Sequence, residues 1–155
     1  MSIRKASPQR LADIVRERGP GESAARAVLA RLRAEVRRRD RSLGLTEGFG
    51  RIYQMMRAAP TLTARLEELG QQMTDALAAV LAEETGAAPD DPLPRVAAAQ
   101  IGAVHSLVFA EIGRRITAGE SPDEIADALE VLLDAAEDLL GGRLLAYAPA
   151  GGGGV

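Results

Sequence analysis

Residues 60–86 read PTLTARLEELGQQMTDALAAVLAEETG, and this stretch decides the fold class. Leucine, methionine and valine recur every three or four residues through it, at positions 62, 66, 69, 73, 77 and 80. That spacing places the apolar side chains on one side of an α-helix. Pro60 disfavours helical geometry in the residue before it, and Gly86 supplies a C-terminal stop. The stretch therefore predicts a helix from about Leu62 to Thr85.

Glycine, proline and capping residues divide the rest of the chain into further helical segments. Ser23 has the residue type of an N-cap, and Ser121 begins a Ser-x-x-Glu capping-box spacing. No segment alternates with the period of two that a half-buried strand requires. The sequence therefore predicts an all-α fold, with helices at about residues 8–18, 23–38, 46–58, 62–85, 92–118 and 122–140.

The composition is that of one soluble globular domain. The 155 residues are 46% hydrophobic but only 3% aromatic, so alanine, leucine, valine and isoleucine must fill the core. There is no cysteine, which excludes disulfides, thiolate nucleophiles and cysteine-ligated zinc. The N-terminal residues lack the apolar stretch of a signal peptide, and no uninterrupted apolar run has the length of a membrane span. We expect a cytoplasmic protein that does not contact a membrane.

Charge is distributed unevenly along the chain. Residues 1–43 carry a net charge of +7 and residues 44–155 a net charge of −10. A basic N-terminal portion is compatible with nearby nucleic acid. An arginine-rich helix face exposed to solvent explains the same excess, and it is the more ordinary explanation.

The residues needed for catalysis are scarce. His105 is the only histidine, and Gly102 stands where a Glu-x-x-His metal motif would need glutamate. His105 and Ser106 are adjacent on a predicted helix, so their side chains diverge by about 100° and form no nucleophile–base pair. We expect neither enzyme activity nor a metal or cofactor.

Two features of the predicted helices suggest binding instead. Aromatic and methionine side chains gather at Phe49, Tyr53, Met55 and Met56, and methionine suits a pocket for an apolar ligand, although such clusters more often form ordinary core. The last two long helices carry apolar residues on more than one face. In a soluble protein this surplus favours self-association into an isologous four-helix interface.

The order of helices and turns resembles the C-terminal half of TetR-type transcriptional regulators. The resemblance is clearest at RAAPTLTARL (residues 57–66), which looks like the hinge between two ligand-domain helices of that family. After it come LAEETG at 81–86, an Asp/Pro loop, a long helix rich in alanine, valine and leucine, and a Gly-Glu-Ser-Pro turn before a leucine-rich helix. The resemblance covers about residues 22–142. The chain is most similar to the subgroup associated with acyl-CoA-like ligands and with the mycofactocin regulator.

The resemblance implies a six-helix orthogonal bundle that senses a small, largely apolar or acyl-type effector and forms a homodimer. The residues implied to bind the effector are Phe49, Tyr53, Met56, Met73, Leu77, Gln100, Ile101, Val104 and His105. Of these, Gln100 and His105 would supply polar contacts, although a lone buried histidine is more often structural. The residues implied at the dimer interface are Val108, Ile112, Ile116, Ile125, Leu129, Leu132, Leu133 and Leu140.

The resemblance also sets the expected domain organisation. Family members begin with a helix-turn-helix unit of about fifty residues that reads DNA. Residues 1–22 are too short to hold it, so we expect a connecting segment there, a ligand-binding and dimerisation domain at 23–142, and a disordered glycine-rich tail at 143–155. DNA would be contacted only through the absent unit. The alternative is a standalone carrier or interaction module for a lipid-like ligand that never binds DNA.

Overall fold

The computed structural model of the chain describes residues 7–40, 43, 55 and 58–151. Within these residues the secondary structure consists of six helices, with no strand. The all-α prediction is confirmed for this part of the chain, whereas the helix expected at 46–58 falls largely outside it. The helices are α1 (Arg10–Arg16), α2 (Ala24–Arg37), α4 (Pro60–Thr85), α5 (Leu93–Thr117), α6 (Pro122–Leu139) and α7 (Gly142–Leu145).

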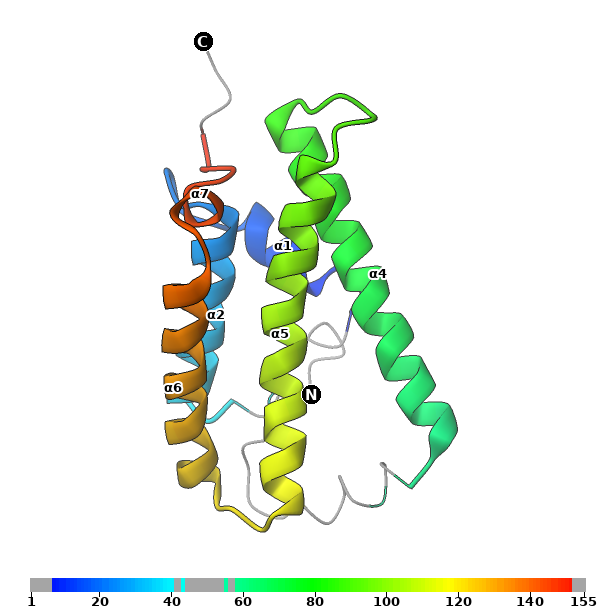
Figure 1. Cartoon of the computed structure of the whole chain (residues 1–155), viewed down its shortest axis with the longest axis vertical. Coiled ribbons are helices and arrows are strands. Elements are labelled where there is room, and N and C mark those ends of the chain that lie inside the picture. Colours follow the sequence, from blue (N-terminus) through cyan, green and yellow to red (C-terminus); the bar gives the residue numbers. More distant parts are fainter. Residues whose placement is uncertain (1–6, 41–42, 44–54, 56–57, 152–155) are drawn as a thin grey trace.

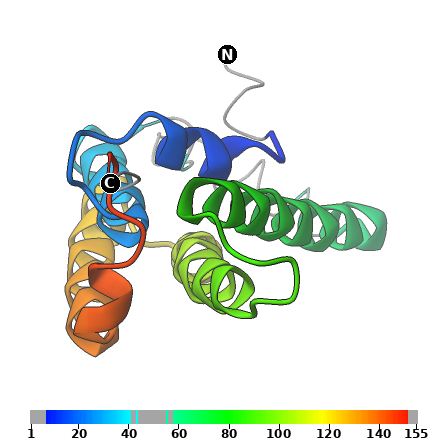
Figure 2. The same cartoon turned by 90° about the horizontal axis from the view of Figure 1, so that it is seen from above.

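The long helices pack around one core, and the short α1 crosses one end of them. Helix α5 lies between α4 and α6, with α2 behind α6 (Figure 1). Seen from above, α1 lies across α2 and α4, and α5 lies on the opposite side of the bundle (Figure 2). Buried leucine, isoleucine, valine and alanine from α1, α2, α4, α5 and α6 form the core. Aromatic side chains make no large contribution to it among the described residues.

The predicted helix caps at the two serines are present. Ser23 Oγ accepts a hydrogen bond of 3.3 Å from the backbone N–H of Arg26. Ser121 forms a complete capping box: its Oγ accepts from the Glu124 N–H at 3.2 Å, and its own N–H donates to Glu124 Oε2 at 3.0 Å. Each cap satisfies backbone N–H groups that have no partner within the helix.

Helix α4 begins at Pro60, earlier than the predicted start at about Leu62. Ala59 is extended and precedes the helix, while Pro60 occupies its first turn. Proline is tolerated there because the N–H that it lacks would have no helical acceptor. Gly86 ends the helix as predicted, in the left-handed conformation at φ 64°.

Helices α4 and α5 approach each other closely at Gly102. A Cβ atom added to this glycine would lie 2.5 Å from Oγ1 of Thr74 on α4. Thr74 Oγ1 itself donates a 3.1 Å hydrogen bond to the Gly70 carbonyl. The absent side chain at position 102 therefore allows the two helices to lie this close.

The C-terminal segment differs from the disordered tail expected at 143–155. After α7, residues 146–150 return to the turn between α1 and α2 (Figure 1). The Gly21 N–H donates to the Ala150 carbonyl at 2.9 Å, and the Ala150 N–H donates to the Glu22 carbonyl at 3.0 Å. These backbone bonds leave no periodic pattern in the sequence, and residues 152–155 lie outside the described part.

Helix α5 is apolar over most of its circumference. Among the described residues it is the one helix long and apolar enough to cross a membrane by length and composition. A core helix of a soluble protein passes the same test, and the inward side of α5 is buried against α4 and α6. Its outward side is also apolar, with Val96 and Leu107 exposed to solvent.

Candidate functional site

A buried arginine on α1 pairs with a buried glutamate on α2. Arg10 Nη2 lies 2.6 Å from Glu35 Oε1, and Arg10 Nη1 donates to Glu35 Oε2 at 3.1 Å. The side chains are 4% and 0% exposed. A guanidinium and a carboxylate match in this two-bond geometry, which offsets part of the cost of removing both charges from water.

His105 on α5 completes this group, which we call the polar cluster (Arg10, Glu35 and His105). Arg10 Nε donates to His105 Nε2 at 3.0 Å, so Nε2 acts as the acceptor and the neutral ring carries its proton on Nδ1. Burial, together with the positive charge of Arg10, lowers the pKa of His105 to about 4. The ring also lies against Phe109, with centroids 4.9 Å apart.

The polar cluster connects three helices rather than presenting reactive groups. Arg10 lies on α1, Glu35 on α2 and His105 on α5, at sequence separations of 25 and 95 residues. A neutral histidine held as an acceptor for arginine is not placed as a general base toward solvent. The arrangement fixes α1 against α2 and α5 through directional, charge-assisted bonds.

Arg10 and Glu35 were not predicted as site residues, although the sequence contains a signal for them. Glu35 stands three residues after Leu32 and directly before Val36, on the apolar face of a predicted helix. A carboxylate on such a face requires a partner, because an unpaired buried charge is costly. Arg10 in turn directly precedes the apolar residues of α1.

The residues expected to bind the effector fall into three groups. Met73 and Leu77 on α4 and Ile101 on α5 are buried in the common core, beside the buried His105, and Val104 is half-buried. Gln100 is exposed, so it points away from that core. Phe49, Tyr53 and Met56 lie outside the described residues.

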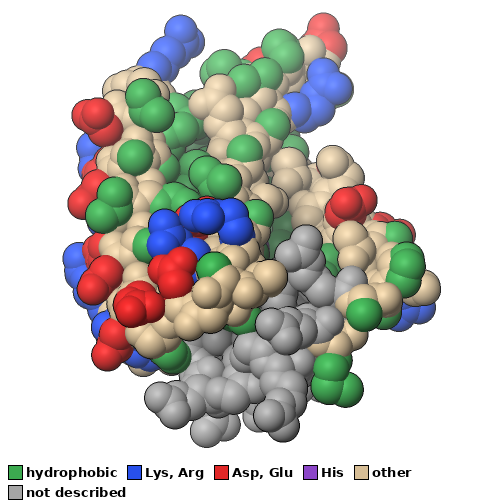
Figure 3. Space-filling model, turned by 60° about the horizontal axis from the view of Figure 1, so that its bottom comes forward, with side chains coloured by type: hydrophobic (Ala, Val, Ile, Leu, Met, Phe, Trp, Pro, Cys, Tyr) green, Lys and Arg blue, Asp and Glu red, His purple; other side chains and the backbone are tan. Residues whose placement is uncertain are grey.

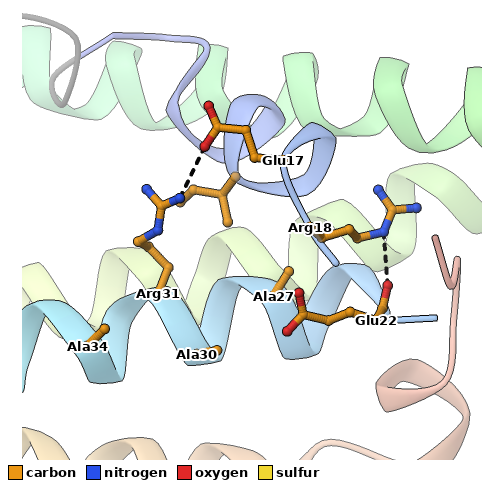
Figure 4. A pocket seen from close by; sticks show the side chains of 8 residues that line it. Glu17, Arg18, Glu22, Ala27, Ala30, Arg31 and Ala34 are labelled. Carbon is orange, nitrogen blue, oxygen red and sulfur yellow. Dashed lines mark hydrogen bonds and ion pairs between the residues drawn. The ribbon is translucent and has the colours of Figure 1, made fainter. Parts of the chain in front are cut away.

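A hollow of about 230 Å³ lies elsewhere, at the junction of α1 and α2 (Figure 4). Alanine side chains of α2 form one side, and a 3.1 Å ion pair between Glu17 and Arg31 spans one end. The other charged groups also have partners: Glu22 accepts from the Gly19 N–H, and Arg18 pairs with Glu84 outside the hollow. The lining residues, none of which was expected to bind the effector, are Ile14, Glu17, Arg18, Glu22, Ala27, Ala30, Arg31 and Ala34.

Most residues assigned to a dimer interface are buried within the single chain. Only Leu132 and Leu140 are half-buried. The other six pack inside the core, where a second copy would not reach them: Val108, Ile112, Ile116, Ile125, Leu129 and Leu133.

Other apolar residues of α5 and α6 face outward, and together they define what we call the outer face. Val131 and Leu139 of α6 are 69% and 84% exposed, and Val96 and Leu107 of α5 are about half exposed. Hydrophobic atoms follow both helices on one side of the molecule, with a shallow groove between them (Figure 3). The outer face consists of Val96, Ala99, Ala103, Leu107 and Ala110 on α5, and Val131, Ala135 and Leu139 on α6.

The arginines of α2 pair with the carboxylates of α6 along a row that we call the surface ladder. Arg33 contacts Asp134 at 2.7 Å and Glu137 at 2.8 Å, and Arg37 lies 3.5 Å from Glu130. The basic N-terminal and acidic C-terminal portions of the sequence thus partly neutralise each other within the fold. This pairing favours the helix-face interpretation of the arginines over a nucleic-acid interface.

Comparison of the chain with protein-family models, with curated proteins and with solved structures gives no match.

Proposed function

We propose that the chain is the effector-sensing and dimerisation domain of a TetR-type transcriptional regulator, with no enzymatic activity of its own. In this proposal the helices form the six-helix orthogonal bundle of that family. Two copies associate through α5 and α6, and a small apolar or acyl-type effector binds among α4, α5 and the segment around Phe49 and Tyr53. DNA is contacted only by a helix-turn-helix unit outside this chain.

The outer face is the observation that supports the proposal best. Its apolar residues repeat at three- and four-residue intervals on two neighbouring long helices, which is the pattern of a helix–helix interface. Two helices from each of two copies would form a four-helix interface with a twofold axis. Burying the outer face in such an interface would remove exposed leucine and valine from water, which is favourable by about 25 cal/mol per Å² of apolar area.

The polar cluster supports the sensing part of the proposal. It joins α1, the first of the described helices, to α5, which lies beside the proposed effector site. A displacement of His105 on α5 would therefore directly alter its hydrogen bond with Arg10 on α1. In an intact regulator, α1 would lead to the DNA-reading unit, so its position would matter for the spacing of the two readers.

Sedimentation at micromolar concentration tests the dimer. We expect a mass of two chains, and a Leu107→Glu/Val131→Glu variant should sediment as a folded monomer, because burying unpaired carboxylates at the interface is costly. Leu66→Glu is the matched control, since Leu66 is exposed on α4, away from the outer face. A wild-type monomer, or an outer-face variant that still dimerises, would contradict the proposed interface.

Thermal melting with palmitoyl-coenzyme A tests the effector site. At a hundredfold excess over the dissociation constant, binding to the folded state should add roughly 2.7 kcal/mol of stability. Coenzyme A alone is the matched ligand control, and it should stabilise far less if the acyl chain fills an apolar site. Equal melting temperatures with and without the acyl ligand would count against a site for this effector class.

A further inference from the structure

The segment Leu145–Ala150 lies along the turn that joins α1 to α2. In addition to the two backbone bonds between this turn and Ala150, Ser23 Oγ donates to the Leu145 carbonyl at 2.6 Å. The Ala24 N–H donates to the Tyr147 carbonyl at 3.3 Å. The start of α2 is therefore bonded to the C-terminal segment at both its cap and its first residue.

Arg18, in the turn after α1, adds a side-chain connection to the same segment. Its Nη2 donates to the Ala148 carbonyl at 3.1 Å, and its Nη1 lies 2.7 Å from Glu84 Oε2 in the last turn of α4. The same guanidinium donates to the carbonyls of Val15 and Glu22 at 2.6 Å and 3.0 Å. With only 4% of its side chain exposed, Arg18 joins the ends of α1 and α4 to the C-terminal segment.

The C-terminal segment is packed as well as hydrogen-bonded. Ala148 is buried, and Tyr147 packs partly buried against the core. Ala148 adopts the left-handed conformation at φ 53°, which a residue with a Cβ rarely does unless its surroundings hold it. The surrounding bonds to Arg18, Gly21 and Ala24 provide that restraint.

Helix α1 depends on such contacts because it is short. It has seven residues, and a helix of that length has little stability without tertiary packing. The polar cluster holds its first turn through Arg10. The turn that follows its last residue is held by Arg18 and the C-terminal segment.

We propose that residues 145–150 form a C-terminal clasp that holds α1 in place and makes its position depend on the end of α6. The clasp is reached from α6 through only Leu140 and Gly141 and the single turn of α7. A displacement of α6 is therefore transmitted through backbone bonds to the turn between α1 and α2, and through the Arg18 side chain to the last residues of α1. A regulatory role for this connection rests on the proposed function, in which α6 lies at the dimer interface. The clasp itself does not depend on that proposal.

Amide hydrogen exchange on two truncated chains tests the clasp. Deleting residues 147–155 removes the C-terminal partners of Gly21, Ala24 and Arg18. Exchange in α1 and in the following turn should then accelerate by about tenfold or more, as expected when local opening becomes easier. Deleting residues 152–155 is the matched control, and exchange should stay as in the full chain. The amides of α5 should change little in either case.

Arg18→Met in the full chain provides an independent variant, because methionine keeps an apolar stem but donates no hydrogen bonds. It should accelerate exchange in α1 and at residues 147–150 together. Unchanged exchange in α1, or an equal acceleration in every helix, would overturn the clasp. Sedimentation of the same samples separates the two proposals: a monomeric wild type with a clasp-dependent α1 would contradict only the dimer.

Discussion

The polar cluster and the surface ladder use the same ion-pair chemistry in different surroundings. In the polar cluster, both Arg10 and Glu35 are almost entirely removed from water. In the surface ladder, Arg33 is mostly covered, but its partner Asp134 is 70% exposed. The ladder contains more pairs, yet solvent screens each of them and the exposed partners lose little by separating. The number of ion pairs is therefore a poor guide to what holds this fold together.

The two regions also respond differently to the loss of a partner. Removing one charge from a buried pair leaves the other without water or counter-charge, which typically costs far more than the pair itself contributes. Removing one charge from the surface ladder leaves a side chain that water can solvate. We therefore expect the polar cluster to be sensitive to single substitutions and the ladder to be tolerant.

Glu35→Ala should have the largest effect. It leaves the Arg10 guanidinium buried without its carboxylate, and we expect a loss of about 3–5 kcal/mol in the free energy of unfolding, measured by urea denaturation. Arg10→Met/Glu35→Leu removes both charges and should recover most of that loss. If the double variant is as unstable as Glu35→Ala, the cost does not come from an unpaired charge.

Acidification should act on the polar cluster through His105. The pKa of His105 is near 6.5 in the unfolded chain and about 4 in the folded chain. Between pH 6.5 and pH 4, His105 is therefore protonated in the unfolded state but neutral in the folded state. Stability should therefore fall as the pH drops from about 6.5 to 4, by at most about 3 kcal/mol from this group. Urea denaturation across this range measures the loss.

His105→Gln is the matched control for the pH dependence. Its amide oxygen can still accept from Arg10 Nε, but it does not titrate. The carboxylates contribute equally in both chains, so the difference between the two pH profiles isolates the histidine. Parallel profiles between pH 6.5 and 4 would show that His105 is not held neutral.

Arg33→Gln should have the smallest effect of the three. It removes the contacts to Asp134 and Glu137, and we expect a loss of about 0.5–1 kcal/mol at low salt. At 1 M salt the Debye length is about 3 Å, so the difference in stability between the variant and the wild type should largely disappear. A loss comparable to that of Glu35→Ala would abolish the distinction between the two regions.

Local chemistry made much of the fold predictable. Periodic apolar residues and caps depend on neighbours within a few positions, so the sequence was sufficient for α2, α4, α5 and α6 and for the caps at Ser23 and Ser121. The C-terminal clasp was missed because its backbone bonds join residues more than 120 positions apart. Such pairings are set by the tertiary structure and leave no local pattern.

The candidate site was less predictable than the fold. Apolar periodicity predicted that α5 and α6 carry more apolar residues than one buried face requires. It did not distinguish the buried Val108 and Leu129 from the exposed Leu107 and Val131. Which side faces the core depends on how the other helices pack. His105 was recognised as a buried polar residue, whereas its partner Arg10 lies 95 positions away.

The close approach at Gly102 has a consequence for how the domain can change shape. Sliding α5 along α4 by one turn would bring Ala98 or Ser106 opposite Thr74, and either side chain would occupy space that only a glycine leaves free. The nearest other glycine on α5, Gly113, is eleven residues away. Helices α4 and α5 should therefore behave as one rigid body. In any rearrangement of the domain, we expect other helices, such as α1 and α6, to move relative to this pair.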